Sequence, residues 1–480
     1  MRIVNICLGF ILAAASFMAA VSGLADERPN IILFVTDDLS PDAGCYGVES
    51  IKTPHIDALA KDGLRFDQAF CTTASCSASR SVILTGIHNH ANAHYGHEHA
   101  YHHFSSYGDI KSLPVRLTEA GYRTARIGKY HVAPEAVYKF ETVLPGNPRN
   151  AVQMANASRE FIAADDERPF FLYFCTSDPH RSGGSVEGDP YKADPFGNKP
   201  ESYPGVTLES FDPKDVKVHS FLPDTPTCRH ELAQYYQSVS RIDQGLGKLV
   251  QILKAAGQYD NSIIIFTSDH GIAFPGAKTT LYDGGMRIPM IVRAPKCQQR
   301  GGSTEAMVSL LDMTPTILDF AGVWQEPDPK KKEKYAIQGR SFADVVATGK
   351  ATDRDEVYAS HTFHEITMYY PMRVVRTRRY KLIWNIAYPL PYPFASDLWE
   401  APTWQDIYQQ GADALYGKRT VKAYIHRPQF ELYDLQADPD EIHNLADNQE
   451  HQELLQSLKT KLKAFQKQTD DPWILKWDYE

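Results

Sequence analysis

The sequence predicts an α/β fold in which a large, mostly parallel sheet is flanked by helices and is followed by a smaller C-terminal α+β subdomain. Apolar runs of strand length alternate with helical patterns over about the first 355 residues, and that order of elements is typical of a parallel sheet. Beyond this point, two strand-like runs indicate a separate, antiparallel sheet. Three of the early apolar runs end in acidic or histidine residues, which indicates where a site lies.

Uninterrupted apolar runs are typical of strands that are buried on both faces. Such strands are expected at residues 31–35, 170–174 and 262–266, and a further, more polar strand is expected at residues 122–127. Two helices are expected to begin at Thr53-Pro54 and at Ser112-Leu113-Pro114, where a hydroxyl residue can cap the helix and proline fits its first turn. Gly63 and Gly121 are expected to end these two helices. A long helix is expected from Leu232 to Ala256, because its apolar residues recur every three or four positions.

The C-terminal part is expected to contain strands at residues 380–384 and 429–433 and a last amphipathic helix marked by residues 454–465. The run at 330–334, which is rich in lysine, reads as a solvated loop. We therefore divide the chain into a leader, residues 1–25, a main domain, residues 26–355, and a C-terminal subdomain, residues 356–480.

The leader resembles a secretory signal peptide, with Arg2 before an apolar run and small residues at 23–25. A membrane anchor is the alternative, but no later stretch has the ~18 to 20 apolar residues of a spanning helix. Export is expected: periplasmic or extracellular in a bacterium, lysosomal in an animal. The 59 acidic residues outnumber the 50 basic ones, which argues against a broad nucleic-acid surface. No C-x-x-C pair occurs, so a thiolate zinc site is not expected.

Polar side chains follow three of the expected strands directly. They are Asp37-Asp38, then Asp178 with His180, and finally Asp269-His270. Sites in open α/β sheets lie beyond the carboxyl ends of the strands. These residues are therefore expected to converge, although they are far apart in the sequence.

The segment Cys76-Ser-Ala-Ser-Arg80, followed by Leu84-Thr-Gly86, resembles the signature of the type I sulfatases. The resemblance extends in order along the mature chain, and its narrower match is to the branch that acts on the N-sulfate of heparan sulfate. The further motifs are Asp37-Asp38, Gly128-Lys129-Tyr-His131, Asp178-Pro-His180-Arg181, Asp269-His270-Gly271, Lys278, the text from Ser360 to Arg373, and Asp471-Pro-Trp473.

The resemblance implies an alkaline-phosphatase-like sulfatase fold in which a maturation enzyme oxidises Cys76 to formylglycine. Hydration gives the aldehyde two hydroxyls, one to attack sulfur and one whose deprotonation releases sulfate. Arg80 lies one helical turn beyond Cys76 and can hold the hydrate and the sulfate. A single divalent ion, Ca²⁺ or alternatively Mg²⁺, is expected on hard oxygen ligands. Its ligands are Asp37, Asp38, residue 76, Asp269 and His270.

Four further residues are expected around the transferring group. Lys129 and Lys278 neutralise the sulfate charge, His180 protonates the leaving group, and His131 assists deprotonation of the hydrate. Candidates for the sugar pocket are Arg181, His364 and Glu365. The histidine run at positions 88, 90, 94, 97, 99, 102 and 103 is irregularly spaced, and it is expected to form pocket wall and surface rather than a second metal site.

Two positions depart from the family pattern. Ala78 stands where proline is commoner in the modification motif, and His270 stands where many sulfatases have asparagine. The leading hypothesis is hydrolysis of the N-sulfate of glucosamine in heparan sulfate or heparin fragments. The alternatives are an O-sulfatase of another glycan, a phosphoester hydrolase, and an inactive glycan-binding protein; a homodimer is left open.

Overall fold

A computed structural model describes residues 28–182, 194–327 and 333–479, so the expected leader and most of the lysine-rich run lie outside the described residues. The main sheet has eight strands, in the spatial order β5-β4-β6-β1-β7-β8-β2-β9. Among them, β8 runs antiparallel to both of its neighbours. In that order, the bounds are Thr142–Leu144, Arg123–Gly128, Phe170–Cys175, Asn30–Thr36, Ser262–Ser268, Met290–Arg293, Leu64–Phe66 and Gly302–Thr304.

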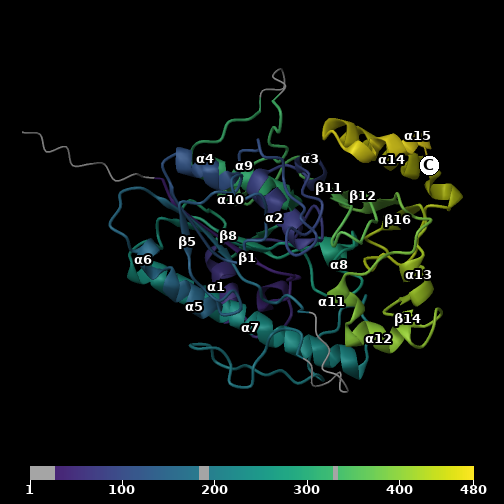
Figure 1. Ribbon diagram of the computed structural model, residues 1–480, viewed down its shortest axis with the longest axis horizontal. Helices are drawn as coiled ribbons and strands as arrows, with labels where there is room; N and C mark the ends of the chain where they lie inside the picture. Colours follow the sequence, from purple (N-terminus) through teal and green to yellow (C-terminus); the bar gives the residue numbers. More distant parts are fainter. Residues whose placement is uncertain (1–27, 183–193, 328–332, 480) are drawn as a thin grey trace, which may run out of the picture.

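Helices cover both faces of this sheet (Figure 1). One group packs around the long helix α7 and consists of α1 (Pro54–Asp62), α5 (Ala151–Ala157), α6 (Arg159–Ile162) and α7 (Pro226–Ala255). The other consists of α2 (Cys76–Thr85), α3 (Asn89–Asn92), α4 (Leu113–Glu119), α9 (Met313–Phe320) and α10 (Ala343–Thr348). Every residue of β1, β6 and β7 is buried, which explains why these strands are continuous apolar runs.

The expected mostly parallel sheet is confirmed, but the expected start of the long helix is wrong. Helix α7 begins at Pro226, and the side chain of its cap, Thr225, accepts a hydrogen bond from the backbone N–H of Cys228. The first turns are polar, so apolar periodicity did not reveal them, whereas the Thr-Pro pair is the same start signal as Thr53-Pro54. The short strands β2, β5, β8 and β9 were also missed, because three or four residues give too little pattern.

The C-terminal part forms a separate antiparallel sheet in the order β11-β12-β13-β16. The strands span Glu356–His361, Met372–Thr377, Tyr380–Asn385 and Phe430–Asp434. Helix α14 (Gln452–Gln468) packs on β12 and β13, and short helices complete this part: α11 (Ser396–Trp399), α12 (Pro402–Tyr408), α13 (Val421–Ile425) and α15 (Lys476–Tyr479). Buried residues of both parts share one large core. The domain boundary at residue 355 stays a prediction, and β11 begins directly after it.

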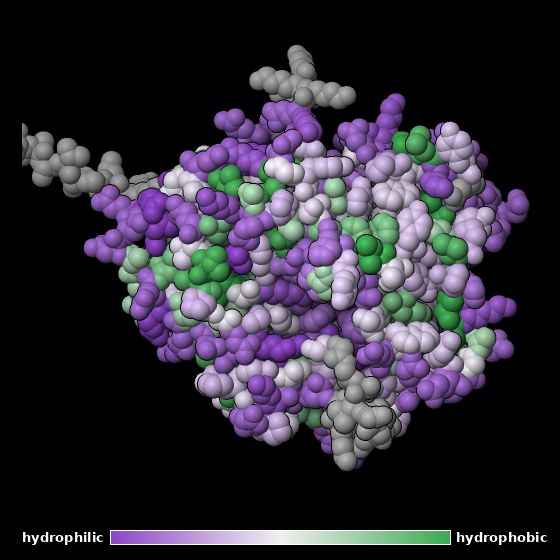
Figure 2. Space-filling model, viewed as in Figure 1, coloured by the Kyte–Doolittle hydropathy of each residue, from purple (hydrophilic) through white to green (hydrophobic). Residues whose placement is uncertain are grey.

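Within the described ranges, no helix has both the length and the apolar character needed to cross a bilayer. On the face seen in Figure 2, hydrophobic residues lie in small separate groups between hydrophilic ones.

A buried ion pair ties the C-terminal tail to the antiparallel sheet. Arg373 on β12 donates two hydrogen bonds to Asp471, and both side chains are fully buried. Although burial alone would raise it, the Arg373 guanidinium holds the pKa of Asp471 far below its usual value. The Asp471 carboxylate therefore stays ionised and compensates a cation that water cannot reach.

We expect Asp471→Asn to lower the free energy of unfolding by about 3 kcal/mol, because it leaves the Arg373 charge buried without its partner. Thermal melting monitored by circular dichroism measures the effect. Asp470→Asn, at the exposed neighbouring position, is the matched control and should melt like the parent protein. Equal melting temperatures for the two variants would contradict the assignment.

Candidate active site

The ends of four adjacent parallel strands build the site. Strands β4, β6, β1 and β7 are neighbours in the sheet, and the expected residues follow each carboxyl end. Lys129 follows Gly128, which has a φ of 84° and where a Cβ atom would lie 2.0 Å from the carbonyl oxygen of Cys175. Only glycine allows this close approach, so it fixes how the chain turns from β4 into the site.

Cys76 is the first residue of α2 and is completely buried. Its Sγ lies 3.3 Å from Nε2 of His270 and 3.7 Å from Oδ1 of Asp38. Burial raises the pKa of the thiol, so the unmodified side chain is a neutral group. It stands at a helix N-terminus, where backbone N–H groups favour an anion.

Arg80 lies one turn further along α2 and joins two of the strand ends. Its Nε donates to Asp269 and its Nη2 to Asp37, each at 3.0 Å, and all three side chains are fully buried. Lys129 binds the other oxygen of Asp37 at 2.5 Å. Although burial alone would raise it, these cations hold the pKa of Asp37 well below its usual value.

The three aspartates that follow the strand ends converge with Cys76 and His270. One ligand atom from each of Asp37, Asp38, Cys76 and His180 lies within 4.8 Å of the others, and the same holds for Cys76, Asp269 and His270. Burial, and then the charge of Asp37, raise the pKa of Asp269 to about 7. Against the effect of burial, Asp269 and Asp38 also raise the pKa of His270. The raised pKa values mean that Asp269 and His270 retain protons, which offset the negative charge of the cluster as a cation would. The hard oxygen donors fit a divalent cation.

His180 and Lys278 meet at Asp38. His180 Nδ1 lies 2.7 Å from Oδ2 of Asp38, and Lys278 Nζ donates to the same oxygen at 3.1 Å. Asp38 has a φ of 61° and His131 a φ of 58°, a strained region for residues other than glycine that is common at functional sites. Burial, and then the nearby Lys129, hold the pKa of His131 well below its usual value, so its imidazole is neutral.

A cavity of about 540 Å³ opens above these groups and is walled on one side by the C-terminal subdomain. Glu365 lines it and accepts hydrogen bonds from the backbone N–H and the hydroxyl of Ser396, both at 2.8 Å. His364 lies in the wall, where its Nδ1 is 2.9 Å from the Ser75 hydroxyl. Cys76 is not part of the lining and lies beneath it.

Arg181, a candidate for the sugar pocket, lines the cavity, but most of its guanidinium is engaged inside the protein. It is 1% exposed, pairs with the buried Glu231 and donates to the carbonyl oxygen of Ala273. Its Nη2 has no hydrogen-bond partner among the described residues, which leaves this one nitrogen for a ligand. Desolvating a charge favours pairing it inside the protein, which a sequence motif does not show.

Sequence reasoning missed Asp397, which lines the cavity and binds Lys278 Nζ at 2.7 Å. His97, His99 and His102 also line this cavity, in keeping with the pocket wall expected of the histidine run. Asp397 lies in the short helix α11 of the C-terminal subdomain with no motif around it. Only the packing of the two parts brings it to the site.

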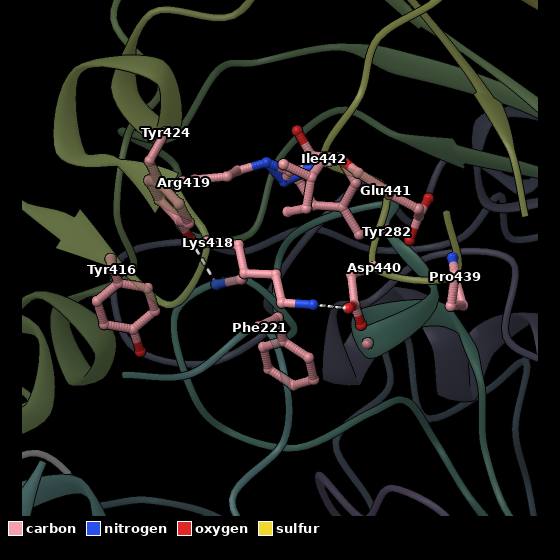
Figure 3. Close-up of a pocket in the computed structure, with 12 residues that line it drawn as sticks. Phe221, Tyr282, Tyr416, Lys418, Arg419, Tyr424, Pro439, Asp440, Glu441 and Ile442 are labelled. Atoms are coloured by element: carbon pink, nitrogen blue, oxygen red, sulfur yellow. Dashed lines mark hydrogen bonds and ion pairs between the residues drawn. The ribbon is translucent and has the colours of Figure 1, made fainter. Parts of the chain in front are cut away.

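A second cavity lies between the main domain and the β14–β15 hairpin (Leu415–Tyr416, Arg419–Thr420). Figure 3 shows Lys418 pointing to Asp440, with which it forms an ion pair at 2.5 Å. At about 40 Å³ it is too small for a sugar. It is a packing gap rather than a binding site.

The comparisons with known proteins agree with this geometry. A sulfatase family model matches residues 29–323, and a model of the N-sulphoglucosamine sulphohydrolase C-terminal domain matches residues 273–411 and 415–468. The chain belongs to the sulfatase family. Human N-sulphoglucosamine sulphohydrolase is 39% identical over 96% of this chain and 94% of its own length. An ulvan-active sulfatase of Formosa agariphila is 30% identical over 92% and 80%.

Solved structures show how widely this fold is used. A protein in complex with its substrate D-glucosamine-2-N,6-O-disulfate has a TM-score of 0.66 and 22% identity, over 93% of this chain and 99% of its own. The phosphonate monoester hydrolase of Agrobacterium radiobacter has a TM-score of 0.64 and 18% identity, over 92% and 96%. The fold therefore does not decide the reaction. Sulfatases generally use formylglycine and a divalent metal.

We expect Ca²⁺ to bind the metal-free protein at least about tenfold more tightly at about pH 8 than at about pH 5, because the ion must displace protons from Asp269 and His270. Both pKa values are raised, so the competing protons are lost only as the pH rises. Calorimetric titration at the two pH values measures this difference.

Asp269→Asn should remove both the tight binding and its pH dependence. Asp42→Asn changes another buried aspartate, one that is bound to His219 and Tyr235 away from the cluster, and should keep both. If the Ca²⁺ affinity of the parent protein is the same at both pH values, the prediction is wrong.

Proposed function

We propose that the protein hydrolyses the N-linked sulfate of glucosamine residues in heparan sulfate or heparin fragments. The observation that carries this proposal is the match to an N-sulphoglucosamine sulphohydrolase along nearly its whole length. That match includes the C-terminal domain, which supplies Glu365 and Asp397 to the cavity. A sulfatase of another specificity would share the floor of the site but not this wall.

We infer that Asp37, Asp38, Asp269, His270 and residue 76 hold one Ca²⁺. The ion would screen the sulfate charge and favour the ionised nucleophile. Three carboxylates in one buried cluster repel each other unless cations lie between them. The oxygen-rich donor set supports a hard ion over a soft one, with Mg²⁺ as the alternative.

We further infer that Cys76 is oxidised to formylglycine by a maturation enzyme and that the chain is exported through its leader. The hydrated aldehyde supplies one hydroxyl for attack on sulfur and a second whose deprotonation expels sulfate. Arg80 is positioned to orient the hydrate. Lys129 and Lys278 are held by Asp37 and Asp38, so their ammonium groups are already placed for the sulfate oxygens and need no reorganisation.

Proton delivery matters more for an N-sulfate than for an O-sulfate, because an amide anion is a very poor leaving group. Asp38 holds the His180 ring through Nδ1, which leaves Nε2 to donate a proton to the leaving nitrogen. Burial, with Lys278 and Lys129, lowers the pKa of His180, so its protonated form is a strong acid. His131, neutral in this environment, accepts the proton of the hydrate.

The wall of the cavity supports recognition of an aminosugar. Glu365 and Asp397 present carboxylate oxygens above the lysines, where they can accept hydrogen bonds from sugar hydroxyls. His364 shapes the wall beside them, with its Nδ1 at the Ser75 hydroxyl and its Nε2 2.8 Å from Nε2 of His97. Cations at the floor and carboxylates at the wall orient the glucosamine residue so that its N-sulfate faces the floor.

We expect the mature enzyme to release sulfate from glucosamine N-sulfate and not from glucosamine 6-O-sulfate, and Cys76→Ala to release none from either. Ion chromatography measures the sulfate, and mass spectrometry of the peptide containing residue 76 confirms maturation. Release only from the 6-O-sulfate would replace the proposal with the O-sulfatase alternative. No release by protein that carries formylglycine would place the substrate elsewhere.

We expect His180→Ala to slow N-sulfate hydrolysis by roughly 10²- to 10⁴-fold, the usual contribution of a general acid. The rate of aryl sulfate hydrolysis should fall much less, because the phenolate leaves without protonation. His219→Ala is the matched control, since His219 is also bound to a buried aspartate, Asp42, but lies outside the cavity lining. Equal losses on both substrates would assign His180 to sulfate binding instead.

A further inference from the structure

Three histidines form a cluster at the mouth of the cavity, apart from the acidic site. One ring nitrogen from each of His97, His99 and His131 lies within 4.8 Å of the others. His97 and His99 come from the loop between α3 and α4, and His131 follows β4. The irregular histidine run therefore gains its third member from another segment, which the sequence spacing did not show.

We propose that His97, His99 and His131 bind a borderline transition-metal ion such as Zn²⁺, with a further position open to water, and that the bound ion blocks sulfate release. Three imidazoles are the donor set of many open zinc sites. Imidazole nitrogen favours Zn²⁺ over Ca²⁺, whereas the carboxylates of the acidic site favour Ca²⁺. The two sites therefore differ in the metal that they take.

The geometry needs little adjustment. Nδ1 of His99 lies 2.5 Å from Nε2 of His131, and the ring centroids of the three residues are 4.6–4.9 Å apart. Zinc–nitrogen bonds of about 2.0–2.1 Å in a tetrahedron separate the nitrogens by about 3.3 Å. His99 is exposed, so it can make this movement without disturbing the core.

The protonation state also suits a metal. The pKa of each of the three imidazoles is lowered, by burial first and also by Lys129, so each is neutral and carries a lone pair. Nδ1 of His97 and Nδ1 of His131 are buried and have no hydrogen-bond partner within the described residues, whereas Nε2 of His97 lies 2.8 Å from Nε2 of His364, so Nδ1 is the nitrogen of His97 that is left for a metal.

The nearby ammonium of Lys129 opposes a second cation, and nearby carboxylates offset part of its charge. Lys129 is bound to the buried Asp37. Glu98 and Glu365 line the same cavity as the three histidines, and Glu365 acts on His99 against burial and Lys129, whose effects dominate and lower its pKa. The bonds from imidazole to the metal therefore have to outweigh the remaining repulsion.

A bound ion would interfere with catalysis directly. It would occupy the imidazole of His131, which the proposed function uses to accept a proton, and it would stand in the path to the cavity floor. Inhibition rests on the proposed function, whereas binding does not, so the two are measured separately.

The test uses calcium-saturated, formylglycine-containing enzyme, so that neither the acidic site nor the thiol of Cys76 competes. Co²⁺ absorption spectroscopy and calorimetry with Zn²⁺ should show one ion per chain, and zinc should inhibit sulfate release. His99→Gln should weaken binding by at least about tenfold and raise the inhibitory zinc concentration equally, relative to its own zinc-free rate. His103→Gln changes an exposed histidine outside the cavity lining and should behave like the parent.

Binding by His99→Gln as tight as that of the parent, or no binding once calcium is present, would overturn the proposal. Zinc binding without inhibition would overturn the claim that the bound ion blocks sulfate release, since the ion would then not reach His131. Failure of sulfate release in every variant without zinc concerns the proposed function alone, because the cobalt spectrum reports the cluster independently.

Discussion

The structure depends on compensating three buried carboxylates with cations drawn from every part of the fold. Asp37, Asp38 and Asp269 are completely inaccessible to solvent, a state that costs several kcal/mol per ion without partners. Arg80 brings the N-terminus of α2 to the ends of β1 and β7, and Lys129 adds the end of β4. The charges that we propose to bind sulfate are thus the charges that hold the elements together. Removing any one of them should affect both stability and chemistry.

The same network extends into the C-terminal subdomain, which explains why the substrate pocket lies at the junction of the two parts. Lys278 is shared between Asp38 on one side and Asp397 on the other. Ser75, next to the nucleophile position, binds His364, and the buried hydroxyl of Ser360 on β11 lies 2.8 Å from His90. Replacing the C-terminal subdomain would therefore change what the pocket recognises and would also disturb the placement of a lysine at its floor.

The extent of prediction from sequence follows from the range of the interactions involved. Buried strands such as residues 30–36 are readable, because burial on both faces requires an unbroken apolar run, and the strand ends locate the acidic cluster through topology alone. The position of Asp397 and the pairing of Arg181 with Glu231 depend on side chains 50 or more residues apart. Such contacts leave no local pattern. The His97–His99–His131 cluster was hidden for the same reason, since its members lie on two loops whose approach only the packed fold defines.

The distribution of charge in the cavity also bears on turnover. The floor is cationic, with Lys129 and Lys278, whereas the wall carries Glu365 and Asp397 beside neutral histidines. A sulfated nitrogen is drawn to the floor, but after hydrolysis the same nitrogen becomes an ammonium that the floor repels. The carboxylates at the wall then attract it toward the opening. Substrate binding and release of the amine product therefore use one fixed arrangement of charges, and the change of sign at the nitrogen reverses the direction of the force.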